Sequence, residues 1–271
     1  MNPTSKFIVT KEYKRFVEFC NACKKDNYIG LCYGHAGVGK SMAAYHYAKW
    51  LKITEEFKRK THQCQDYAWP SFNMSKFDTI IYVPEVKNTP NSVGSSINSI
   101  AWNFKLLVEK SIFKEKTVPW DERPKKRINM LIIDEADRLQ PSSLEQVRDY
   151  YDREEVAVIL IGMPGIEKRL IRFPQLYSRI GFVHEYKSLS IEEVTFIIQN
   201  ELQSLEVAVD VKDFSDHEAI AALVRITQGN FRVINRLLKQ IIRIMAVNRL
   251  TSITKEVVEA ARECLVIGNI Y

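Results

Sequence analysis

The sequence GHAGVGKS occupies residues 34–41 and organises the interpretation of the whole chain. It has the spacing G-x-x-x-x-G-K-[ST], in which glycines let consecutive backbone N–H groups curl around phosphate oxygens. It follows the apolar run NYIGLCYG and precedes KSMAAYHYAKWLKIT, so it lies between an expected strand and an expected helix. The start of that helix adds its positive dipole end to the same site. The alternative is an ordinary glycine-rich turn, and the strand-loop-helix context favours a phosphate-binding loop.

An acidic pair ends a second apolar run, in INMLIIDEADRL. We expect Asp134 at the carboxyl end of a buried parallel strand beside the strand of the phosphate loop, where it holds Mg²⁺ through water. Glu135 is then placed to orient or deprotonate an attacking water. Two capping acids at a strand end are the alternative. Together with the phosphate loop upstream, the pair indicates a nucleoside triphosphatase.

Strands and helices alternate along the first two thirds of the chain. Expected strands cover residues 27–34, 79–86, 128–134 and 156–162, and helical patterns separate them. Only amphipathic helices follow residue 188. The pattern predicts an α/β fold, a P-loop parallel sheet sandwiched by helices, followed by a small all-helical lid domain. The expected parts are an N-terminal helical segment (1–27), the nucleotide-binding domain (28–187) and the lid (188–271).

The fourth expected strand, VAVILIG, ends at a methionine rather than at a polar residue. We expect this strand beside the strand of the phosphate loop, with its tip near the γ-phosphate. A polar side chain is usually needed there to sense phosphate and position water. Gly162 and Met163 supply backbone groups but no strong side-chain donor, which puts rapid hydrolysis in doubt.

Composition sets broad limits. The 271 residues are 46% hydrophobic and 27% charged, as in folded globular proteins, and carry a net charge of +6 that permits a nucleic-acid partner. Five irregularly spaced cysteines predict reduced thiols rather than a disulfide framework. Neither a signal peptide nor an apolar run of about 20 residues is found, so we expect no membrane association.

Several arginines are candidates for phosphate contacts. Arg232 follows Gly229-Asn230 at the start of a lid helix and is placed to reach the phosphates, or is simply a solvated helix-start residue. The segment after the fourth strand holds candidates for a finger that enters a neighbouring subunit's site, and the spacing alone does not choose among them. These candidates are Lys168, Arg169, Arg172 and Arg179.

These motifs together resemble those of AAA+ ATPases: Walker A at 34–41, Walker B at 130–135, a sensor-1 strand at 156–163 and a lid with G-N-x-R at 229–232. More narrowly, LIIDEADRL, VAVILIGMPGIEKRL and PQLYSRIGFVHEY are similar to transposition ATPases of the TnsC, TniB and MuB type. ExeA-type secretion ATPases share the GN-x-R-x-INRL pattern.

The resemblance implies an ATPase with ATP and Mg²⁺ as cofactors, slow on its own and stimulated by DNA or a partner. Lys40, Glu135 and Arg179 would be catalytic, with Arg179 as the trans-acting finger. Ser41 and Asp134 would bind the metal. The cofactor-binding residues would be Gly34, His35, Ala36, Gly37, Val38, Gly39, Lys40, Ser41, Met42 and Arg232.

The resemblance also implies partners. Such ATPases assemble with ATP as rings or helical filaments on double-stranded DNA, recruit or activate a transposase at the target, sometimes with a target-selector protein, and disassemble on hydrolysis. This implies the bacterial cytosol or nucleoid. DNA contacts would come from residues between the Walker motifs, or these lysines are only solvated: Lys87, Lys114, Lys116, Lys125 and Lys126. Open alternatives are an ATP-gated scaffold with little hydrolysis, a secretion ATPase and a helicase loader.

Overall fold

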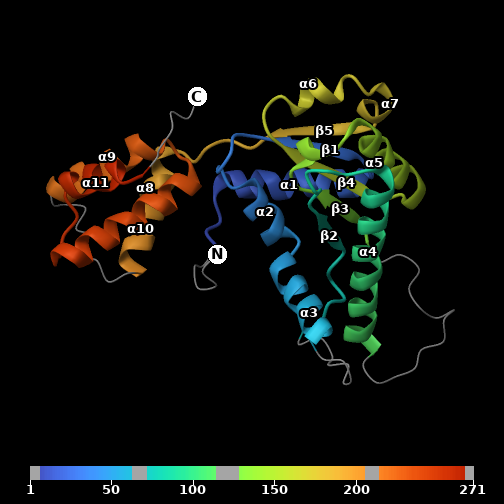
Figure 1. Ribbon diagram of the computed structural model, residues 1–271, viewed down its shortest axis with the longest axis horizontal. Coiled ribbons are helices and arrows are strands. Elements are labelled where there is room, and N and C mark those ends of the chain that lie inside the picture. The colour runs from blue at the N-terminus through green and yellow to red at the C-terminus, as the bar shows by residue number, and fades with distance from the viewer. Residues whose placement is uncertain (1–6, 63–71, 114–127, 205–213, 266–271) are drawn as a thin grey trace. The chain divides into compact units, whose positions relative to one another are not determined.

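The computed structural model describes residues 7–62, 72–113, 128–204 and 214–265. The chain forms two compact units, each described by itself (Figure 1). The sheet unit comprises Tyr13–Gly34 and Lys40–Glu185. The helical unit comprises the described residues up to Glu12, His35–Gly39 and those from Tyr186 onward. The division is therefore not linear in sequence, because most of the Walker A loop groups with the lid helices.

Five parallel strands form the sheet, in the order β2-β3-β4-β1-β5 (Figure 1). Their bounds are β1 Ile29–Tyr33, β2 Thr79–Tyr82, β3 Met130–Ile133, β4 Ala157–Gly162 and β5 Ile180–Glu185. Strands β2, β3 and β4 are buried along their whole length, as expected for parallel strands covered on both faces. The predicted α/β fold with a parallel P-loop sheet is confirmed.

Two expectations about the strands need correction. Strand β4 does lie beside β1, as predicted, but β3 does not: β4 separates the strand that carries Asp134 from the strand of the phosphate loop. Strand β5, which pairs with the other side of β1, was not expected from the sequence. It is an edge strand with mostly exposed side chains, so it lacks the continuous apolar run that revealed the other four.

Helices flank the sheet (Figure 1). The segment expected as one helix over residues 40–54 is two, because Lys49 adopts a left-handed conformation (φ 53°) between α2 and α3. The bounds are α1 Lys11–Asp26, α2 Lys40–Tyr47, α3 Trp50–His62, α4 Pro90–Phe113, the 3₁₀ helix η2 Ala136–Arg138, α5 Pro141–Glu154, α6 Ile166–Leu170 and α7 Pro174–Tyr177. Among the described residues, no helix is both long and apolar enough to cross a membrane.

The helical unit has its own hydrophobic core. Its helices are α8 Ile191–Ser204, α9 Phe214–Thr227, α10 Phe231–Asn248 and α11 Lys255–Glu263. Ile198, Leu223 and Ile241 are fully buried at its centre, and Ile8 from the N-terminal segment packs against this core. The backbone N–H of Lys11, the first residue of α1, donates to Glu193 Oε1 in α8 at 2.7 Å.

Three cysteines, Cys20, Cys23 and Cys32, lie in the interior of the sheet unit. Burial raises the pKa of the Cys20 thiol well above its ordinary value and raises the pKa of Cys23 to about 12. Both thiols are therefore protonated and unreactive near neutral pH. Across the described ranges, no cluster of three or more histidine, cysteine or carboxylate side chains could hold a metal ion.

Candidate active site

The Walker A sequence adopts the backbone that its glycines predict. Gly37 and Gly39 have φ values of +83° and +114°, a region that side chains with a Cβ rarely enter. Lys40 then begins α2. Its side chain is buried, and Nζ donates to the Gly34 carbonyl oxygen at 2.5 Å. The lysine is thus folded back on the entrance of its own loop, the position from which it can turn toward a phosphate.

Asp134 follows β3 directly and is only 4% exposed. Its carboxylate accepts hydrogen bonds from the Ser41 hydroxyl and, at 3.0 Å, from the Glu135 backbone N–H. Burial nevertheless raises the pKa of Asp134 above its ordinary value, although these hydrogen bonds and the charge of Lys40 oppose the rise. A buried carboxylate beside a hydroxyl, with no ion pair to any residue that the structure describes, fits a hard divalent cation such as Mg²⁺. Ser41 and Asp134 would hold that ion, which would neutralise phosphate charge.

Glu135 occupies a special backbone position. Its φ and ψ of 56° and 43° are left-handed, which is uncommon for a residue with a Cβ. The carboxylate forms an ion pair with Arg138, and Arg138 Nη1 also donates to the Pro84 carbonyl oxygen at 3.3 Å. Activation of a water by Glu135 would require its carboxylate to leave Arg138.

The tip of β4 is joined to the turn after Walker B. The Met163 backbone N–H donates to Asp137 Oδ1 at 2.7 Å. Arg169 donates to the Asp137 carbonyl oxygen at 2.6 Å and to that of Leu139. A Cβ at Gly162 would lie 2.5 Å from Asp137 Oδ1, so this approach needs glycine. We call Asp137, Met163 and Arg169 the β4 latch. It occupies both the backbone donor of Met163 and the guanidinium of Arg169, one of the expected finger candidates.

In the helical unit, the Walker A loop is bound to the start of α10. Asn230 is the N-cap: its Oδ1 accepts from the backbone N–H groups of Arg232 and Val233 at 3.1 and 3.2 Å. Its Nδ2 donates to the Ala36 carbonyl oxygen at 2.7 Å, and the Arg232 N–H also donates to the Gly37 carbonyl at 3.1 Å. The cap is predictable from sequence, whereas the contact with Ala36, 194 positions away, is not.

Arg179 is held within its own chain. Its Nε and Nη2 donate to the two carboxylate oxygens of Asp152 at 2.6 and 2.8 Å, a bidentate pair. The guanidinium keeps the pKa of Asp152 below its ordinary value, and it also donates to the Gln175 carbonyl. A finger role would require this pair to open. Lys168 and Arg172, also candidates, have exposed side chains.

The lysines expected to contact DNA are described only in part. Lys87 is exposed, five residues after the end of β2 and beside the equally exposed Val86. The buried Asn88 anchors this turn, because its amide donates to the carbonyls of Glu85 and Arg138. Lys114, Lys116, Lys125 and Lys126 lie outside the described residues.

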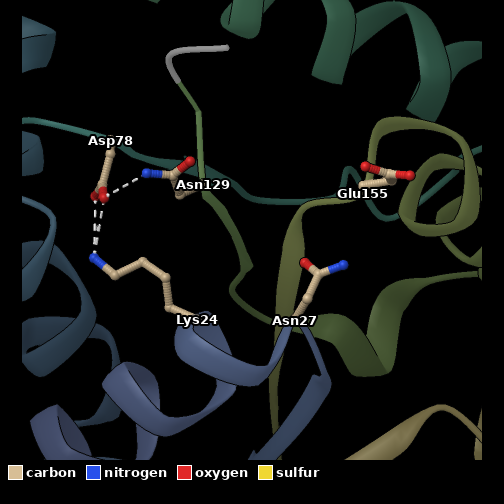
Figure 2. Close-up of a pocket in the computed structure, with 5 residues that line it drawn as sticks. All are labelled: Lys24, Asn27, Asp78, Asn129 and Glu155. Atoms are coloured by element: carbon tan, nitrogen blue, oxygen red, sulfur yellow. Dashed lines mark hydrogen bonds and ion pairs between the residues drawn. The ribbon is translucent and has the colours of Figure 1, made fainter.

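A polar hollow of about 420 Å³ lies at the amino edge of the sheet (Figure 2). Residues that precede strands line it, together with Lys24 at the end of α1. Asp78 accepts from Lys24 Nζ at 3.1 and 3.2 Å and from Asn129 Nδ2 at 3.1 Å. Three of its five lining residues therefore bind one another, and we interpret the hollow as a structural joint between strands and α1.

A buried Walker B aspartate beside a Walker A serine, at the carboxyl edge of a five-stranded parallel sheet, defines a P-loop ATPase. The AAA domain family matches residues 23–170, more than half of the chain. The protein therefore belongs to the AAA domain family. A Staphylococcus aureus protein described as a potential ATP-binding protein is 43% identical over 277 residues, which is 99% of each chain.

Solved structures show the same fold. The Thermotoga maritima RuvB Holliday junction branch migration motor aligns with a TM-score of 0.61 and 17% identity, over 97% of this chain and 71% of RuvB. The Aeropyrum pernix ORC1 protein, in complex with DNA, also aligns with a TM-score of 0.61, at 14% identity over 97% of this chain and 67% of ORC1. At these identities the similarity concerns the fold.

Proposed function

We propose that this AAA-domain ATPase assembles on double-stranded DNA in its ATP-bound form and recruits or activates a transposase there. ATP binding drives assembly, and hydrolysis releases the subunits. Mg²⁺ is held by Ser41 and Asp134, while Lys40 contacts phosphate. Glu135 acts on the attacking water once Arg138 releases it.

The position of Lys87 carries the DNA part of the proposal. All strands of the sheet are parallel, so the turn after β2 lies at the same edge of the sheet as Asp134 after β3. Asn88 links the two turns, because it donates to the carbonyl of Arg138 in the turn after Walker B and its Oδ1 accepts from the Gln140 N–H. A change at the metal site therefore has a short physical route to the exposed Lys87.

Two further points support the proposal. The transposition ATPases that this sequence resembles share its Walker B and β4 segments. RuvB is named as a branch migration motor of the Holliday junction, and ORC1 is described in complex with DNA. Arg179 becomes a trans-acting finger if assembly exchanges Asp152 for a neighbouring subunit's nucleotide.

The test is electron microscopy of the full chain with duplex DNA and a non-hydrolysable ATP analogue. Rings or filaments should appear on the DNA with the analogue and be absent with ADP. The Lys40→Ala variant is the matched control, since it removes the phosphate contact and should remain unassembled. Particles that stay monomeric in the presence of both DNA and the ATP analogue would refute the DNA-assembly proposal. A transposase that co-purifies with the assembled form, and not with Lys40→Ala, is expected.

A second candidate, an ATP-gated scaffold with little hydrolysis, is favoured by Met163, which offers no strong side-chain donor at the tip of β4, and by the Glu135–Arg138 ion pair. Steady-state ATPase measurements with and without DNA separate the two candidates, because turnover well above background with DNA excludes a pure scaffold. Met163→Asn should raise the rate or leave it unchanged. A marked fall with nucleotide binding intact would show that Met163 already serves the site.

A further inference from the structure

The solvent-exposed face of α10 carries positive charge and no negative charge. The helix contains no acidic residue. Its exposed basic side chains recur every three or four residues, and its buried side chains, which include Leu237, Ile241 and Met245, lie on the opposite face. The exposed basic residues are Arg232, Arg236, Lys239 and Arg243. Because Arg232 is a candidate nucleotide contact, we define the cationic face of α10 by the other three.

The three side chains have no ion pair within the part of the chain that the structure describes. Helix α5 shows the usual alternative. There Arg148 pairs with Glu145 at 2.8 Å and with Asp152 at 2.6 Å, and Arg153 pairs with Asp149 at 3.2 Å. These two arginines of α5 are thus balanced within their own helix, whereas the basic residues on the exposed face of α10 are not.

This excess of positive charge destabilises helix α10 itself. Like charges three or four residues apart on a helix repel one another, and Arg236, Lys239 and Arg243 have this spacing. Their neighbours at the border of the face, Asn235 and Gln240, are uncharged. Since nothing within the described part of the helical unit compensates the repulsion, a bound polyanion would relieve it.

We infer that the cationic face of α10 is a second contact surface for the phosphate backbone of double-stranded DNA, separate from Lys87. The inference rests on the proposed function. At 1.5 Å per residue the face spans about 10 Å, while one strand of a duplex presents a phosphate about every 3.4 Å of axis. Three long flexible cations can therefore follow one strand for about three phosphates. Such contacts position the protein without reading the base sequence.

The experiment measures duplex DNA binding of the full chain by fluorescence anisotropy, with a non-hydrolysable ATP analogue, over a series of salt concentrations. The test variant is Arg236→Gln, Lys239→Gln, Arg243→Gln, because glutamine keeps helix propensity and removes charge. We expect affinity at low salt to fall at least about tenfold. The slope of log affinity against log salt should become shallower by about 2 to 3, near 0.9 for each phosphate that the variant no longer neutralises.

The control variant is Lys14→Gln, Lys25→Gln, Lys76→Gln. It removes the same net charge from exposed lysines of the sheet unit and should bind within about twofold of wild type, since these sites lie off the contact surface. A thermal melt should show the α10 variant folded, at or above the wild-type transition, because repulsion along the helix is removed.

Several outcomes overturn the inference. Equal losses in both variants would show that only net charge matters. If the wild-type chain binds DNA and the α10 variant binds it with the same affinity and the same salt dependence, this surface is rejected and the proposed function stands. A wild-type chain that binds no DNA would reject both. If the α10 variant keeps DNA binding but loses binding to phosphatidylserine vesicles, the face contacts a membrane surface instead.

Discussion

Each edge of the sheet carries an aspartate, and the two side chains lie in opposite environments. At the carboxyl edge Asp134 is almost fully buried, and burial raises its pKa. At the amino edge Asp78 is partly exposed and bound by Lys24 and Asn129. Among the described residues Asp134 forms no ion pair, although the charge of Lys40 acts on it, whereas Asp78 pairs with Lys24 at 3.1 Å.

This difference indicates which edge of the sheet is suited to bind a ligand. A buried charge without an ion-pair partner costs stability even when it accepts hydrogen bonds, as Asp134 does from Ser41 and Glu135. A Mg²⁺–nucleotide complex would compensate this charge. At the amino edge the charge of Asp78 is already paired with Lys24, so a ligand in the hollow would bring no comparable gain in stability. Proteins commonly keep residues that cost stability at the sites where they function.

The largest expected effect comes from removing Lys40 at the carboxyl edge, with removal of Lys24 at the amino edge as the control. Lys40→Ala should weaken ATP binding by about ten- to hundredfold, because a hydrogen-bonded charge on phosphate is removed, and should abolish measurable turnover. Lys24→Ala should leave ATP affinity unchanged, because it belongs to the opposite edge. Titration with a fluorescent ATP analogue measures both. Equal losses would refute the division of roles between the edges.

A smaller effect is expected at the β4 latch. Asp137→Ala removes the acceptor of the Met163 N–H and should lower kcat about tenfold with little change in KM, because the β4 tip and the turn carrying Glu135 shift relative to the phosphates. Asp137→Asn keeps an acceptor oxygen and should restore most of the rate. Steady-state kinetics decide the matter. A rate that is equally low in both variants would point to the charge of Asp137 rather than to its hydrogen bond.

Replacing each aspartate by asparagine should change stability in opposite directions. Asp134→Asn removes a desolvated charge and should raise the free energy of unfolding of the nucleotide-free chain by up to about 1 kcal/mol. Asp78→Asn removes the ion pair with Lys24 and should lower it by about 0.5–1 kcal/mol. Urea titration without nucleotide measures both. The same sign in both variants would contradict the comparison of the edges.

The pH dependence of that difference is the smallest effect. The pKa of Asp134 is raised in the folded chain, so the folded state holds its proton more tightly than the unfolded state. Wild type therefore loses stability relative to Asp134→Asn as pH rises from about 4, the usual value of an aspartate, through the raised pKa. Above that pKa the difference should level off. Urea titrations of both proteins at several pH values test this, and a difference independent of pH would exclude Asp134 as its source.

Much of the site was predictable because its signals are local. The Walker A glycines, Lys40 and the apolar run before Asp134 each follow from the chemistry of a few adjacent residues. Strand β5 escaped prediction because an exposed edge strand has no continuous apolar run. The β4 latch escaped because Asp137 and Met163 are 26 positions apart and meet through one backbone N–H, which leaves no sequence pattern.

Short-range pattern was thus sufficient for four of the five strands, for the phosphate loop and for the class of ATPase, since backbone geometry and burial act over a few residues. Folding alone placed β4 between β1 and β3, paired Arg179 with Asp152 and joined Asn230 to Ala36. Those arrangements depend on contacts between distant segments, and residue spacing carries no information about which distant partners meet.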